Sequence, residues 1–216
     1  MKRLIIFALL IPAMNLMGQK DPAAEKFLNK VAKDLDPGEA ISISFDYERE
    51  DQQAGTTIDG SGSLVLMGEK YKIDLGEAII WFNGEKQYSL QTEIEEVYVS
   101  TPDPDNKEFM FTDPIRLLRN YQQEFKYRLI GEKDFHGKSA TEIQLYPEVL
   151  GGPFALLKLY FSRDNGNLFA IVIRHKEGIL YTMILDEMEQ VASPGEDFFR
   201  FSQEEYPNVD VIELLN

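Results

Sequence analysis

Alternation of apolar and polar residues with a period of two is the feature that most restricts the fold of this chain. Ile41, Ile43, Phe45 and Tyr47 are separated by serines and acidic residues, as in a strand with one face buried. Similar short segments recur, some alternating and some continuously apolar. We expect strands at 41–47, 58–67, 71–75, 78–82, 86–90, 96–100, 125–130, 141–146, 155–162, 168–175 and 179–186.

Two segments instead carry apolar residues three and four positions apart, which is typical of an amphipathic helix. Asp21-Pro22 resembles an N-cap followed by the first helical residue, and this helix ends before Pro37-Gly38. Asp113-Pro114 repeats the signature and predicts a second helix over 113–121. About ten or eleven strands with two helices predict an α+β fold with a barrel-like antiparallel sheet and helices on one face.

The first eighteen residues are typical of a secretory signal peptide. Lys2-Arg3 precedes an apolar run from Leu4 to Met14, and the small residue Gly18 follows. The run is shorter than the roughly 20 residues that span a bilayer. We therefore expect a signal peptide at 1–18, a single domain at 19–216, and a soluble protein exported to the periplasm.

Composition excludes several classes of function. The chain has 37 acidic and 22 basic residues, a net charge of −15, so it repels the phosphate backbone of nucleic acids and we expect no nucleic-acid partner. It contains no cysteine, which rules out disulfides, thiolate metal sites and a lipid-modified N-terminal cysteine. The protein is therefore not itself a lipoprotein. We expect a monomer.

Residues suited to catalysis are sparse. The two histidines, His136 and His175, fall on different hairpins, whereas a triad or a metal site needs several convergent side chains. Gly60-Ser61-Gly62 lies within a strand, so it is not a phosphate-binding loop. We predict no catalytic residue, no metal, no cofactor and no enzymatic activity.

Large apolar residues occupy the inward-facing positions of most predicted strands. They either fill an ordinary core or line a cavity, and alternation alone does not separate the two.

Four short motifs occur in the following order along the chain. Gly60-Ser61-Gly62-Ser63-Leu64 is a G-x-G-x-L segment, and the stretch from Ile79 to Tyr88 reads as a strand, an N-G turn and an aromatic strand. Leu145-Tyr146-Pro147 is an L-x-P element, and Phe199 with Phe201 forms a final F-x-F element. In these motifs and in the order of its elements, the chain resembles the LolA family of periplasmic lipoprotein carriers over nearly all of its exported part.

The resemblance implies an incomplete antiparallel β-barrel with helices as a lid over an apolar cavity that holds lipoprotein acyl chains. An inner-membrane ABC-type release complex would load the carrier, and an outer-membrane acceptor would unload it. The family has a lid-closing arginine after the G-x-G-x-L strand; here that region reads Met67-Gly68-Glu69-Lys70, and Lys70 is the candidate substitute. The candidate cavity residues are Ile43, Phe45, Leu64, Leu66, Tyr71, Ile73, Ile80, Phe82, Tyr88, Leu117, Leu118, Leu159, Phe161, Ile171 and Ile173.

Three other functions remain open at this stage. The chain could be a specialised lipid carrier, a lipoprotein-sensing regulator with the same fold, or an exported enzyme acting on an apolar substrate. The missing nucleophile–base pair argues against the enzyme.

Overall fold

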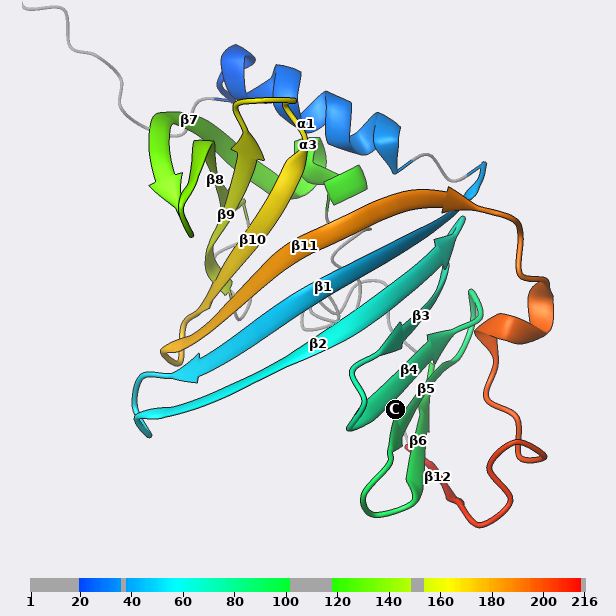
Figure 1. Ribbon diagram of the computed structural model, residues 1–216. Coiled ribbons are helices and arrows are strands. Elements are labelled where there is room, and N and C mark those ends of the chain that lie inside the picture. The colour runs from blue at the N-terminus through cyan, green and yellow to red at the C-terminus, as the bar shows by residue number, and fades with distance from the viewer. Residues whose placement is uncertain (1–19, 36–37, 102–117, 149–153, 215–216) are drawn as a thin grey trace, which may run out of the picture.

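The N-terminal helix forms where the sequence predicts it. The structure, a computed structural model, describes residues 20–35, 38–101, 118–148 and 154–214. Helix α1 (Pro22–Asp34) begins after Asp21, whose side chain accepts a hydrogen bond from the Ala23 backbone N–H at 2.9 Å. Its buried face, which includes Leu28, lies against the sheet (Figure 1). The predicted capping signal is confirmed.

Within the described residues, twelve strands form one sheet in the order β12-β6-β5-β4-β3-β2-β1-β11-β10-β9-β8-β7. Neighbours pair antiparallel, except that β12 runs parallel to β6. The strands are β1 (Ala40–Asp51), β2 (Thr56–Met67), β3 (Lys70–Asp74), β4 (Ala78–Phe82), β5 (Gln87–Gln91), β6 (Glu96–Ser100), β7 (Phe125–Phe135), β8 (Lys138–Pro147), β9 (Phe154–Ser162), β10 (Leu168–His175), β11 (Ile179–Val191) and β12 (Asp210–Glu213).

All eleven predicted strands are confirmed, with changes at their ends. Strands β7 and β11 run five residues further than predicted, to Phe135 and Val191. The prediction missed β12, and it assigned no secondary structure around the F-x-F motif, where the 3-10 helix η2 (Glu196–Phe199) forms. Short helix α3 (Tyr121–Glu124) begins where the predicted helix over 113–121 ends, and most of that prediction lies outside the described residues.

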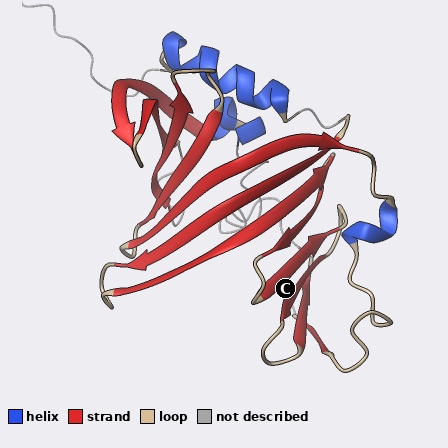
Figure 2. Ribbon diagram, in the orientation of Figure 1, coloured by secondary structure: helices blue, strands red, loops and turns tan. Residues whose placement is uncertain are grey.

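The sheet is curved but open, because its two edge strands, β7 and β12, do not pair with each other (Figures 1 and 2). Helices α1 and α3 lie along one side of it (Figure 2). The architecture is the predicted α+β incomplete barrel with a helical lid. None of the helices in the described part of the chain is long and apolar enough to cross a membrane.

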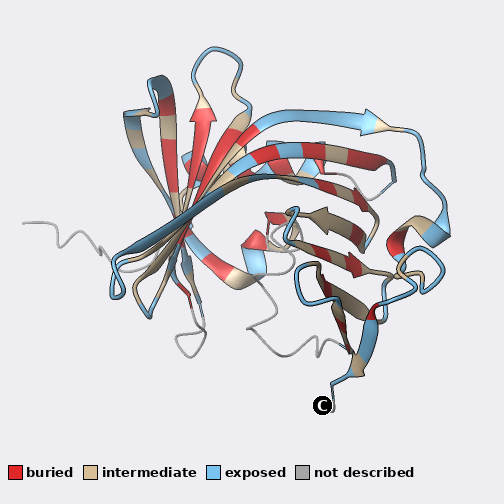
Figure 3. Ribbon diagram, turned by 60° about the horizontal axis from the view of Figure 1, so that its bottom comes forward, coloured by how far each residue is buried: buried red, intermediate tan, exposed pale blue. Residues whose placement is uncertain are grey.

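The buried side chains form three separate clusters. The largest, here called the inner cluster, joins α1 to strands from both halves of the sheet, and Figure 3 shows the buried positions along these strands. A second cluster forms between β4, β5, β6 and the C-terminal segment, and includes Trp81 and Val209. A third lies on β8, β9 and β10 around Tyr160 and Phe169.

Two glycines in β2 make room for aromatic rings of the inner cluster. Gly62 pairs with Phe45 and Gly60 pairs with Tyr47 across the β1–β2 ladder. A Cβ atom on Gly62 would lie 2.8 Å from the Phe45 ring and 2.9 Å from the backbone oxygen of Asp74. The G-x-G spacing therefore has a packing cause, since glycine in a strand permits this close approach.

Candidate functional site

The candidate site is the apolar space between the concave face of the sheet and the lid. Lid here means α1 together with residues 118–124. Most of the predicted cavity residues belong to the inner cluster, where they are buried: Ile43, Phe45, Leu64, Leu66, Tyr71, Leu118, Leu159, Phe161, Ile171 and Ile173. Ile73, Ile80 and Phe82 are half-buried against the same cluster. Leu117 lies outside the described residues.

Tyr88 does not face this space, so its assignment to the cavity is wrong. It pairs with Trp81 across β4 and β5 and stacks on Phe201, with ring centroids 6.2 Å apart. Both partners belong to the second cluster, whereas the neighbouring β4 residues Ile80 and Phe82 pack in the inner cluster. Because successive side chains of a strand point to opposite faces, Tyr88 lies on the face away from the lid.

The described part of the inner cluster contains a small cavity of about 20 Å³, lined by Leu35, Ile43, Phe45, Leu64, Leu118, Leu168, Ile171, Met183, Leu185 and Met188. All ten lining residues are apolar. This volume is close to that of a single water-sized probe, so an acyl chain enters this cavity only if side chains or the lid move.

A much larger cleft of about 570 Å³ opens beside this cavity, between the end of α1, the β9–β10 turn and the last part of β11. Its volume is within the usual range for ligand sites. Leu35, Leu168, Leu185 and Met188 line both the cleft and the small cavity. We call these four side chains the partition, because they stand between the open cleft and the apolar interior.

Arg119 connects the lid to the sheet. Its Nε donates a hydrogen bond to the Leu35 carbonyl oxygen at 2.8 Å, and its Nη1 donates to the Gly68 carbonyl oxygen. Leu35 caps α1 and Gly68 follows β2. The family resemblance implies a lid-closing cation directly after β2. The structure instead has an arginine on the lid segment that reaches back to that position.

Lys70 lies elsewhere. Its ammonium group contacts the Glu196 carboxylate in η2, and the hydrogen bond from Lys70 lowers the pKa of Glu196. Lys70 therefore attaches the C-terminal segment to β3, and the structure does not bring it together with Leu118 or α1.

Polar contacts along the rim hold α1 to α3. The Tyr121 hydroxyl donates to Asn29 Oδ1 at 2.7 Å, and Gln122 Nε2 donates to Glu25 Oε1 at 3.0 Å. Burial raises the pKa of Tyr121 above an ordinary value that already lies well above neutral pH, so the hydroxyl is a protonated donor at neutral pH. The two parts of the lid are thus linked as one cover.

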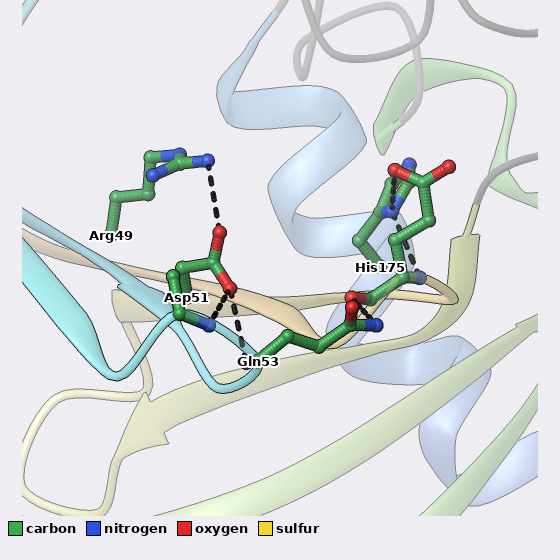
Figure 4. A network of polar contacts seen from close by, with 6 residues as sticks. Arg49, Asp51, Gln53 and His175 are labelled. Atoms are coloured by element: carbon green, nitrogen blue, oxygen red, sulfur yellow. Dashed lines mark hydrogen bonds and ion pairs between the residues drawn. The ribbon is translucent and has the colours of Figure 1, made fainter.

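The histidines do not converge on a site. His136 occupies the β7–β8 turn with φ of 49°. His175 lies at the far end of the sheet, where its Nδ1 accepts a hydrogen bond from the Glu177 backbone N–H at 3.2 Å (Figure 4). Gln53, in the β1–β2 turn, donates a hydrogen bond to the Glu177 carbonyl oxygen at 2.8 Å, which connects this turn to the β10–β11 turn. Among the described residues, no group of three or more acidic or histidine side chains could hold a metal ion.

Comparison with solved structures shows the fold. An uncharacterized conserved protein from Thermus thermophilus is similar with a TM-score of 0.56 and 12% identity, covering 89% of this chain and 99% of that one. Since the identity is low, the likeness concerns the fold alone. No family model matches the chain, and no curated protein matches it in sequence.

LolA superfamily proteins are among the solved structures similar to this chain. The LolA superfamily protein NE2245 from Nitrosomonas europaea has a TM-score of 0.46 and 9% identity, covering 82% of this chain and 97% of that one. A domain from Vibrio parahaemolyticus, named for outer membrane lipoprotein sorting, has a TM-score of 0.45 and 10% identity, covering 82% and 97%.

Proposed function

We propose that this protein is an exported, non-enzymatic carrier that binds the acyl chains of lipoproteins in its apolar interior and moves them from the inner to the outer membrane. The observation that carries the proposal is the small cavity with a wholly apolar lining, reached from an open cleft through a partition of four side chains. A chain of methylene groups is the ligand chemistry that such a lining favours.

The small size of this cavity fits a carrier that must also release its cargo. Burying about ten methylene groups is worth roughly 8 kcal/mol, which corresponds to a dissociation constant near ~1 μM. In the free protein the lid already buries this apolar surface, so acyl binding replaces existing contacts and its net gain is smaller. After release, the side chains and the lid pack together again, and this packing favours transfer of the acyl chain to an acceptor. A ligand shifts the equilibrium between the open and closed lid only by the difference between its affinities for the two states.

Two side chains make the interior adaptable. Met183 and Met188 line the small cavity, and methionine changes shape more readily than branched apolar residues. Movement of these two residues, with opening of the Arg119 contact, would create space for an acyl chain.

The partners follow from the same proposal. An inner-membrane ABC-type release complex would load the monomeric carrier in the periplasm, and an outer-membrane acceptor would unload it. The net charge of −15 opposes adhesion of the carrier to anionic membrane surfaces, which suits a protein that has to leave each membrane.

Native mass spectrometry of the protein purified gently from its own cell envelope tests the proposal. We expect a fraction carrying a triacylated lipoprotein that detergent washing removes. Co-purification of a free lipid instead would favour the specialised lipid carrier. A ligand-free mass, together with no uptake of added palmitate, would contradict acyl binding altogether.

A further inference from the structure

Strand β11 separates from β10 halfway along its length. It pairs with β1 from Ile179 to Val191, but its pairing with β10 ends at Ile184, opposite Ala170. The β1–β11 register shifts between Ser44 and Phe45, next to this point. A bulge bends its strand and increases the local twist. The last part of β11 stays beside β1, whereas β10 diverges from it and leads up to α1 (Figure 1), where the Lys30 ammonium donates a hydrogen bond to Asn167 Oδ1 at 2.8 Å.

The last part of β11 therefore has one open edge. Leu185 and residues 187–191 pair with β1 on one side, and no other described strand pairs with residues 185–191 on the other. Residues 185–190 line the 570 Å³ cleft along that edge. Backbone N–H and C=O groups on an open strand edge are a template for pairing with another extended chain.

The two faces of this strand differ in chemistry. Leu185 and Met188 lie opposite Phe45 and Ile43 on the inner face and belong to the partition. Glu187 and Glu189 lie opposite Ser44 and Ser42 on the other face and are exposed. A strand added here would have one face toward the apolar interior and the other beside carboxylates.

The rim of the cleft is negatively charged. Asp164, Asp186, Glu187 and Glu189 line it and form no ion pair with another described residue. The lining contains one basic residue, Lys138, which lies over the Phe169 ring at 5.4 Å. The cleft therefore favours a segment with basic side chains.

From this arrangement we infer that the cleft binds the peptide segment next to the acylated end of the cargo, as an extended strand added to the free edge of β11. The inference rests on the proposed function and specifies how the cargo is recognised. Acyl chains pass the partition into the interior, while the peptide pairs with residues 185–191. Basic residues at alternate positions face Glu187 and Glu189. Seven residues of strand offer about 23 Å of edge at roughly 3.3 Å per residue.

Four fluorescent probes test this inference by fluorescence anisotropy. They are a palmitoylated six-residue peptide of alternating Lys and Ser, the same peptide with Glu in place of Lys, the Lys peptide with alternate backbone amides N-methylated, and a palmitoyl chain with no peptide. We expect the Lys peptide to bind about tenfold or more tightly than the Glu and N-methylated peptides. Palmitate alone should still bind.

The variant Glu187→Lys/Glu189→Lys should reverse the preference between the Lys and Glu peptides. The matched control is Glu204→Lys/Glu205→Lys, which alters two exposed glutamates in the C-terminal segment and should leave the preference unchanged. Equal affinity for all peptide probes, with palmitate still bound, would overturn the inference and leave the carrier proposal standing. Failure of every palmitoylated probe to bind would overturn both.

Discussion

Arg119 and Leu35 join the two parts of the lid, because the Arg119 Nε donates a hydrogen bond to the Leu35 carbonyl oxygen at 2.8 Å. A second hydrogen bond from the same guanidinium reaches Gly68 at the end of β2. One side chain thus connects α1, the lid segment and the sheet beside the apolar interior.

Removing this side chain should make the lid easier to open. We expect Arg119→Ala to lose about 1–3 kcal/mol of unfolding free energy and to take up a fluorescent acyl probe several times faster, measured by stopped flow. Lys70→Ala is the control, because Lys70 contacts Glu196 in the C-terminal segment. An unchanged uptake rate in folded Arg119→Ala would remove this contact from the opening step.

Two substitutions at Phe45 should show separately how the size and the polarity of the small cavity affect acyl binding. Phe45 is 3% exposed and lines the small cavity. Phe45→Ala should cost about 3–5 kcal/mol of stability through the cavity that it leaves, and it should bind palmitate more tightly because less must be displaced. Phe45→Asp should bind palmitate more weakly. Calorimetric titration of the two folded variants gives the comparison; equal affinities would exclude β1 from the acyl site.

The two glycines of β2 should differ in their tolerance of a methyl group. Gly62→Ala meets the Phe45 ring and the backbone oxygen of Asp74, whereas Gly60→Ala meets only the outer part of the half-buried Tyr47 ring. Because backbone moves less readily than the end of a side chain, Gly62→Ala should cost about 1–3 kcal/mol and Gly60→Ala less. Urea unfolding of both variants tests this order, and a larger cost at Gly60 would contradict it.

Asp21 makes the attachment of α1 depend on pH. Its Oδ2 accepts a hydrogen bond from the Leu129 backbone N–H at 3.1 Å, which ties the start of α1 to β7. Hydrogen bonds from the backbone N–H groups of Leu129 and Ala23 hold the pKa of Asp21 below its ordinary value. The carboxylate therefore stabilises the fold above that ordinary value, and this contribution is lost as pH falls through the lowered pKa.

Comparison with Asp21→Asn measures that contribution. The variant keeps an oxygen for capping but replaces charge-assisted hydrogen bonds with neutral ones, and we expect it to be about 1 kcal/mol less stable near neutral pH. The difference should shrink on acidification below the ordinary pKa. A stability difference that does not change with pH would contradict a role for the ionised carboxylate.

The strands were predictable because each carries its own local signal. Alternation in β1 and the Asn83-Gly84 turn between β4 and β5 depend only on neighbouring residues. Strand β12 lacks such a signal, since only Val211 and Ile212 are apolar in its four residues. It forms through parallel pairing with β6, a long-range interaction without a local sequence pattern.

The apolar residues that surround the site were largely predictable, but the face of the sheet toward which each side chain points was less so. β4 is apolar on both faces, with Trp81 in the second cluster and Ile80 in the inner one. The sequence of β4 therefore does not indicate on which face of the sheet a cross-strand neighbour such as Tyr88 lies. Arg119 was missed because its acceptors are backbone carbonyls, which any residue supplies. The cleft arises where β10 and β11 separate, and that depends on strand pairing across the sheet.

The central claim is that acyl chains enter the inner cluster, and fluorescence quenching by a brominated palmitoyl chain tests it most directly. The chain has a single tryptophan, Trp81, which lies in the second cluster away from the lid. Its fluorescence reports on the face of the sheet away from the lid, whereas the tryptophan of the double variant Met183→Trp/Trp81→Phe reports on the small cavity. We predict strong quenching in the double variant and none in the unaltered protein. Quenching of Trp81 alone, or of neither, would contradict acyl binding between the sheet and the lid.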